Sequence, residues 1–194
     1  MGTDAAFRHC ADIARRHYEN FPVASLALPR PMRRAAVVIY AFSRTADDLA
    51  DEGELPAAAR LEALEAYGAG LDAALEGRPA GDPVLTATAA AIRRHALPPR
   101  LFHDLLHAFR QDVTRRRYGT HEEVLDYCRH SANPVGRLLL HLAGEDREEN
   151  LRDSDAVCTA LQLVNFLQDL HQDYARHGRI YLPADEMARH GVHE

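Results

Sequence analysis

The chain has 194 residues, of which 46% are hydrophobic and 27% charged, a composition typical of a globular protein with a substantial core. Its formal net charge is −6, and the densest basic run, residues 115–117, is short, so nucleic acid is not an expected partner. No apolar run is long enough to span a membrane, and we predict neither a signal peptide nor a transmembrane helix.

The three cysteines, Cys10, Cys128 and Cys158, are scattered along the chain and form no Cys-x-x-Cys pair. This pattern is typical of free thiols in a reducing compartment, so we expect a cytoplasmic location.

Pro, Gly and capping residues divide the chain into a series of expected helices. Prolines interrupt the segment 21–31, and Gly53 and Gly178 are expected to follow helix ends. The segment 120–123 has the spacing of a capping box, Thr-x-x-Glu, which marks a helix start. We expect helices over 4–18, 32–52, 56–75, 84–95, from Pro98–Pro99 to near Arg117, from Thr120 to a break at Pro134–Gly136, onward to about Leu142, and over 154–177.

No strand pairing or internal repeat emerges from the sequence, and Ala and Leu outweigh the residues that strands prefer. We therefore predict an all-α fold, a single helical bundle over residues 1–194. In such bundles, functional sites are built from side chains on facing helices.

A polar stripe follows one face of the expected helix 32–52. Five side chains share this face at the helical period: Tyr40, Arg44, Asp47, Asp48 and Asp51. Apolar residues cover the rest of the helix, which predicts burial on several sides. The stripe is therefore expected to line an internal cavity.

The acidic end of this stripe is unfavourable as plain structure. Asp47, Asp48, Asp51 and Glu52 crowd the last turn and a half of the helix, where the helix dipole disfavours anions. Like charges four residues apart also destabilise a helix, by about 0.2–0.5 kcal/mol per pair. Two interpretations stay open here: a solvated acidic helix end, or a site for a divalent cation that offsets the repulsion.

A second polar stripe follows the expected helix 154–177, at spacings of three, seven and eleven residues. It consists of Gln162, Asn165, Asp169 and Asp173. Apolar residues again surround the stripe, and we expect this helix to be central in the bundle. If the two helices face each other, six side chains become candidate Mg²⁺ ligands: Asp47, Asp48, Asp51, Asn165, Asp169 and Asp173.

Arg44 lies one helical turn before Asp48 and suits bidentate binding of phosphate oxygens. The alternative is a salt bridge from Arg44 to Asp47 or Asp48. His103 and His107 lie one turn apart around Asp104, but no Glu-x-x-His pair supports a di-iron site, so structural roles are expected.

Three separated segments, in this order, resemble motifs of the squalene/phytoene synthase family. The segment 40–52, YAFSRTADDLADE, resembles its first aspartate motif, and 162–173 with the trailing 178–183, GRIYLP, resembles the second. The segment 127–136 resembles the family's intervening region. The resemblance covers about residues 18–183 and implies an isoprenoid-synthase helical bundle.

Within this family the segments 20–25 and 165–169 most resemble bacterial hydroxysqualene synthases of the hopanoid pathway. Asn20 and Gln168 depart from the broader family pattern, and the absence of Arg at 168 removes one diphosphate contact. The resemblance therefore favours Mg²⁺-dependent conversion of presqualene diphosphate to hydroxysqualene. It implies catalytic roles for Asp47, Asp51, Asp169, Asp173 and Arg44, and substrate binding by Phe21, Tyr40, Arg44, Tyr127, Gln162 and Arg179.

Phe21, Tyr40 and Tyr127 are candidates to face the carbocation, since aromatic rings stabilise positive charge without acting as nucleophiles. Ordinary core packing is the alternative for each. No nucleotide-binding glycine pattern occurs, so no nicotinamide cofactor is implied.

Two other functions stay open. One is head-to-head condensation of farnesyl or geranylgeranyl diphosphate, as in presqualene diphosphate, squalene or phytoene synthases. The other is a non-catalytic relative that binds isoprenoids or assists assembly, although all six candidate ligands are retained.

Because relatives continue beyond the second motif, we expect the chain to be incomplete at its C-terminus and to lack the last helices. Peripheral membrane contact is conceivable for a lipid substrate, and the sequence does not indicate an oligomeric state.

Overall fold

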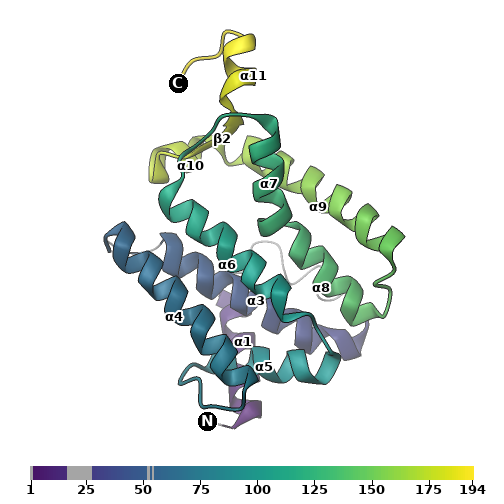
Figure 1. Cartoon of the computed structure of the whole chain (residues 1–194). Helices are drawn as coiled ribbons and strands as arrows, with labels where there is room; N and C mark the ends of the chain where they lie inside the picture. The colour runs from purple at the N-terminus through teal and green to yellow at the C-terminus, as the bar shows by residue number, and fades with distance from the viewer. Residues whose placement is uncertain (1, 17–27, 52, 54) are drawn as a thin grey trace.

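The computed structural model of the chain describes residues 2–16, 28–51, 53 and 55–194, and helices dominate these ranges (Figure 1). The all-α class predicted from the sequence is confirmed. The helices are α1 (Thr3–Arg16), α3 (Arg30–Asp51), α4 (Ala57–Leu75), α5 (Pro83–His95), α6 (Pro99–Thr114), α7 (His121–Ser131), α8 (Asn133–Ala143), α9 (Glu148–Gln168), α10 (Leu170–His177) and α11 (Ala184–Arg189). Two short strands are β1 (Arg117–Tyr118) and β2 (Ile180–Pro183).

Local chemistry fixes several helix ends where the sequence predicts them. Thr120 caps α7, because its hydroxyl accepts a hydrogen bond from the backbone N–H of Glu123 at 3.3 Å. Asp82 caps α5 in the same way, accepting from Leu85 N–H at 3.0 Å. Gly178 ends α10 with φ +61°, a left-handed conformation that favours Gly.

Helix α3 runs through the middle of the bundle and packs against α1, α4, α5, α6 and α8 (Figure 1). Phe42 on α3 is fully buried and contacts the rings of Tyr67 and Phe102, each with a centroid separation of 5.1 Å. Val38 and Ile39 are buried beside it. The predicted burial of this helix on several sides is therefore confirmed, and the residues of its polar stripe are half-buried.

The expected helix 154–177 differs from the prediction in two ways. It begins earlier and is divided at Asp169 into α9 and α10. It is also peripheral: α9 packs on α7 and α8 along one side, and only Phe166 of its residues is buried. Leu161 and Leu167 are 60% and 62% exposed. The prediction that this helix is central is wrong for the described part of the chain, because no described element covers its second apolar face.

A second correction concerns β-structure, which the sequence did not predict. The strands β1 and β2 pair in parallel, with Arg117 opposite Ile180 and Tyr118 opposite Pro183, and the register shifts between these pairs. The expected fifth helix ends at Thr114, three residues early, because the following residues enter this pairing. The strand pair joins segments about 60 residues apart in sequence and places residues 179–181 beside α6 and α7.

Two leucines, one buried and one exposed, test this arrangement. Leu71 on α4 is fully buried, so Leu71→Ala is expected to lower the free energy of unfolding by about 2–5 kcal/mol. Leu161→Ala on the exposed face of α9 is expected to change it by less than about 0.5 kcal/mol. Urea unfolding followed by circular dichroism measures both values, and equal losses would contradict a peripheral α9.

Candidate functional site

The polar stripe of α3 is half-buried and carries a local ion pair. Arg44 lies 3.2 Å from an oxygen of Asp47 and 2.5 Å from an oxygen of Asp48. Its side chain is 27% exposed. Of the two expected roles for Arg44, the structure thus contains the salt bridge, and binding of phosphate oxygens stays a prediction.

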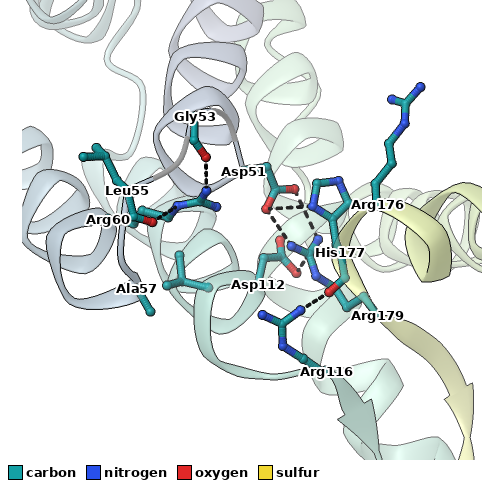
Figure 2. A pocket seen from close by; sticks show the side chains of 11 residues that line it. Asp51, Gly53, Leu55, Ala57, Arg60, Asp112, Arg116, Arg176, His177 and Arg179 are labelled. Carbon is teal, nitrogen blue, oxygen red and sulfur yellow. Dashed lines mark hydrogen bonds and ion pairs between the residues drawn. The ribbon is translucent and has the colours of Figure 1, made fainter.

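The last aspartate of this stripe is paired with a residue that follows the second motif. Arg179 donates from Nη2 to Asp51 at 2.6 Å and from Nη1 at 3.3 Å, across 128 positions of sequence (Figure 2). Asp51 is 19% exposed and Arg179 only 6%. Burial lowers the pKa of Arg179, but the hydrogen bond to Asp51 and the charges of Tyr181, Asp112 and Asp51 together raise it above its ordinary value, so the guanidinium stays charged. This ion pair brings the first and second motifs together at one place.

Asp112 on α6 is a second acidic partner of Arg179 that the sequence analysis missed. One of its carboxylate oxygens lies 3.7 Å from Arg179 Nη1. Its oxygens also accept hydrogen bonds from the hydroxyls of Tyr127 and Tyr181, both at 2.7 Å. A signal was present in the sequence, because Asp112 continues the face of α6 formed by the buried residues Leu101, Leu105 and Ala108.

The aromatic residues beside Asp112 form a packed cluster. Tyr181 stacks on Phe166 with a centroid separation of 4.1 Å and on Tyr118 at 5.4 Å, and Tyr127 contacts all three rings. Tyr127 is 4% exposed. Its ring therefore has the core-packing role that was the alternative for it, and its contact with a substrate stays a prediction.

The second polar stripe is more open to solvent than the first. Asn165 and Asp169 are exposed, and Gln162 and Asp173 are half-buried. The backbone N–H groups of Asp169 and Asp173 still donate to the carbonyls four residues earlier, at 2.8 Å each, so the stripe continues across the division between α9 and α10. Burial raises the pKa of Asp173, and the charges of Asp169 and Asp51 raise it further. The acidic groups of both motifs therefore share one electrostatic environment.

Burial also disfavours the charged form of two other carboxyl groups. It raises the pKa of Asp47 to about 7, with Asp51, Asp112 and Asp48 raising it further against the opposing effect of Arg44. Burial raises the pKa of Asp112 to about 6, opposed chiefly by Arg179. Ionisation of Asp47 and Asp112 is therefore less favourable in the folded protein than in water.

This donor set fits Mg²⁺ in its chemistry. Within residues 2–16, 28–51, 53 and 55–194, no three His, Cys, Asp or Glu side chains are placed to hold one metal ion, and the α3 carboxylates Asp48 and Asp51 are paired with Arg44 and Arg179. Mg²⁺ does not require such a cage, since it usually binds one or two carboxylates together with water and substrate phosphates. A bound cation would also favour the charged form of Asp47, whose pKa is raised by burial and, to a smaller extent, by the neighbouring carboxylates.

A cavity of about 300 Å³ opens beside the ion pair, and basic groups dominate its wall (Figure 2). Arg60, Arg116, Arg176 and Arg179 line it together with His177. Two of these arginines are already bound to the backbone: Arg60 donates to the carbonyls of Ala50, Gly53 and Leu55, and Arg116 donates to that of His177. The cavity therefore offers positive charge next to Asp51.

The remaining candidate residues lie apart from this centre or outside the described ranges. Phe21 and Asn20 belong to the segment 17–27, which lies outside the described residues. Tyr40 is half-buried on α3, one turn before Arg44. His103 lies 2.9 Å from Asp72, and His107 packs on the ring of His130, so both have the structural contacts expected of them.

Known proteins are similar to this chain in sequence and in fold. The squalene/phytoene synthase family model matches residues 14–194, which is most of the chain. The chain belongs to this family. Among curated members, it is 43% identical over 174 residues to the hydroxysqualene synthase of Rhodopseudomonas palustris, covering 90% of this chain and 58% of that protein. It is 35% identical to the phytoene synthase of Mycobacterium tuberculosis, covering 97% of this chain and 61% of that protein.

Solved structures of the family agree with the fold. The squalene synthase HpnC from Alicyclobacillus acidocaldarius superposes with a TM-score of 0.89 at 40% identity, covering 98% of this chain and 70% of that one. A dehydrosqualene synthase superposes with a TM-score of 0.83 at 29% identity, covering 98% of this chain and 65% of that one.

The chain spans about three fifths of the length of the curated relatives it matches. None of the described helices is long and apolar enough to cross a lipid bilayer.

Asp47 provides a stability test of the site. Its raised pKa means that the folded state binds a proton more tightly than the unfolded state, so its contribution to stability is lost as pH rises from about 4 through 7. Asp47→Asn is therefore expected to stabilise the cation-free protein at pH 8. Because the Asp47 side chain is 39% exposed, we expect a gain of only about 1 kcal/mol.

The stability gain of Asp47→Asn should shrink as pH falls toward 4. With Mg²⁺ present, Asp47→Asn should instead be less stable than the native protein, because only the native protein has the proposed Asp47 ligand. Urea unfolding at pH 4, 6 and 8 measures this gain, and Asp153→Asn on the exposed surface of α9 is the matched control. A loss of stability in Asp47→Asn at pH 8 without cation would contradict the interpretation.

Proposed function

We propose that the chain provides the diphosphate-binding site of an enzyme that converts presqualene diphosphate to hydroxysqualene in the presence of Mg²⁺. The observation that carries the proposal is the ion pair between Asp51 and Arg179, which joins the two aspartate-rich segments. The 43% identity to a hydroxysqualene synthase supports this choice of substrate.

In the proposed reaction the carbon–oxygen bond to the diphosphate breaks, and its electron pair leaves with the diphosphate oxygen. The cyclopropylcarbinyl cation rearranges, a water oxygen bonds to the product cation, and that water loses a proton. Bound Mg²⁺ would stabilise the negative charge that develops on the leaving group. The side chains proposed to hold it are Asp47, Asp48, Asp51, Asn165, Asp169 and Asp173.

The chain's own cations complete the proposed diphosphate site. Arg44 lies beside Asp47 and Asp48, and Arg179 beside Asp51, so each places a guanidinium next to carboxylates proposed to hold the metal. A guanidinium can donate two parallel hydrogen bonds to phosphate oxygens. Both groups would stabilise the leaving diphosphate electrostatically, and the half-buried setting strengthens such interactions.

The side chains proposed to contact the rest of the substrate are Phe21, Tyr40, Tyr127 and Gln162. Of these, Tyr40 and Gln162 are half-buried on the two motif-bearing helices. The proposal for Tyr127 requires its ring edge, since its hydroxyl is already bound to Asp112. A cytoplasmic location and contact with a membrane stay predictions.

Head-to-head condensation of two prenyl diphosphates is the second candidate function. The 35% identity to phytoene synthases over nearly the whole chain favours it. The two functions differ in substrate, so parallel incubation with presqualene, farnesyl and geranylgeranyl diphosphates separates them. Hydroxysqualene from the first alone supports our proposal, whereas presqualene diphosphate or phytoene from the others supports condensation. No diphosphate release from any of them would contradict both functions.

Asp51 is the residue on which the proposed site most depends. Asp51→Asn removes a proposed metal ligand and the charged partner of Arg179, so we expect Mg²⁺-dependent binding of inorganic pyrophosphate to weaken about 10–100-fold. Isothermal titration calorimetry with pyrophosphate at fixed Mg²⁺ measures this. Asp153→Asn, which changes an exposed carboxylate on α9, should bind like the native protein. Equal affinity in the native protein and Asp51→Asn would sink the proposed site.

A further inference from the structure

Asp112 is a buried carboxylate that belongs to neither aspartate-rich segment. It lies on α6, is 7% exposed, and contacts residues of α7 and β2. A carboxylate in such a place is strongly destabilised unless its oxygens are hydrogen-bonded and its charge is paired. Its partners therefore indicate what it does.

The hydrogen bonds of Asp112 hold both of its oxygens in place. Tyr127 donates to Oδ2 and Tyr181 donates to Oδ1, each at 2.7 Å. The two hydroxyl oxygens lie 3.5 Å apart, but each hydroxyl proton is already directed at the carboxylate. Burial and the neighbouring carboxylate raise the pKa of Tyr127 well above its ordinary range, so this phenol keeps its proton. The carboxylate cannot rotate without breaking one of these bonds.

Arg179 lies between this fixed carboxylate and Asp51. Its Nη2 donates to Asp51 at 2.6 Å and its Nη1 donates to Asp51 at 3.3 Å, while Nη1 also lies 3.7 Å from Asp112 (Figure 2). Nη1 also donates to the hydroxyl of Tyr181 at 3.2 Å. One guanidinium charge is thus divided between two carboxylates. If Asp112 were neutral, the whole charge would act on Asp51 and would compete with any cation that binds there.

We propose that Asp112 is a positioning residue, which shares Arg179 with Asp51 and thereby keeps the Asp51 carboxylate available to a divalent cation. This inference rests on the proposed function, because it assigns Asp51 as a ligand. Asp112 acts through Arg179 and through its own negative charge at a distance, and it does not touch the cation. Removal of its charge lowers cation affinity by both routes, so the direction of the effect is fixed.

A purely structural role is the competing explanation, since Asp112 also cross-links α6, α7 and β2. Two variants separate these roles. Asp112→Asn removes the charge but keeps an amide of similar shape. Tyr127→Phe removes one hydrogen bond from the same carboxylate and keeps its charge. It also keeps the ring proposed to contact the hydrocarbon part of the substrate, which inorganic pyrophosphate lacks. Both variants disturb the hydrogen bonds around Asp112, but only Asp112→Asn removes the negative charge that pairs with Arg179.

The experiment measures Mg²⁺ affinity by calorimetry at fixed inorganic pyrophosphate, at a temperature where each variant is folded. The chain has seven Tyr and no Trp, so near-ultraviolet circular dichroism reports directly on the tyrosine environment. We expect Asp112→Asn to weaken Mg²⁺ binding about tenfold, and Tyr127→Phe to stay within about threefold of the native value, in line with effects of groups outside the direct ligand set.

Three outcomes would overturn the inference: native Mg²⁺ affinity in Asp112→Asn, equal weakening in both variants, or weakening in Tyr127→Phe alone. If Asp112→Asn does not fold, Tyr127→Phe decides by itself, because a carboxylate released from Tyr127 should hold Arg179 at least as strongly. Native or tighter Mg²⁺ binding then supports the proposal, and weaker binding contradicts it. Failure of the native protein to bind Mg²⁺ at all would instead refute the proposed function.

Discussion

The ion pair between Asp51 and Arg179 is the interaction on which the arrangement of the site depends. Arg179 is almost fully buried, and a buried guanidinium without an anionic partner would strongly destabilise the fold. It can reach Asp51 only because Gly178 ends α10 in a left-handed conformation and the next residues pair with β1. A two-stranded element at the edge of a helical protein thus fixes the geometry between two helices.

The sequence predicted the first stripe well because local periodicity and local burial agree there. Helix α3 is apolar around most of its circumference, and other helices pack against several of its sides, so even its polar face is half-buried. The same reasoning failed for α9, where Leu161 and Leu167 are apolar but exposed. Periodicity shows which face of a helix is apolar, but only the other elements of the fold decide whether that face is covered.

Long-range contacts account for the other differences between sequence and structure. The pairing of Arg117–Tyr118 with Ile180–Pro183 involves too few residues to leave a strand pattern in either segment. Asp112 left a detectable signal, a charge on an apolar helical face, but its partners Tyr127, Tyr181 and Arg179 lie on other elements. The motif residues can be proposed from sequence because each motif is local, and their roles stay predictions. The structure adds the buried groups that connect the two motifs.

The balance of charge explains why such a site suits a divalent cation. Asp47 and Asp48 share Arg44, and Asp51 and Asp112 share Arg179, so four carboxylates meet two guanidinium groups. When all are ionised the net charge of these six groups is −2. Asp169 and Asp173 add negative charge nearby, and Arg60, Arg116 and Arg176 at the cavity wall add positive charge. Burial is the main cause of the raised pKa values of Asp47 and Asp112, and neighbouring carboxylates raise them further, so the ionised forms are disfavoured in the fold. Protonation relieves this cost at low pH, whereas at neutral pH the proposed divalent cation would stabilise the ionised carboxylates. The stability that the chain loses by burying these carboxylates is therefore coupled directly to its proposed affinity for Mg²⁺.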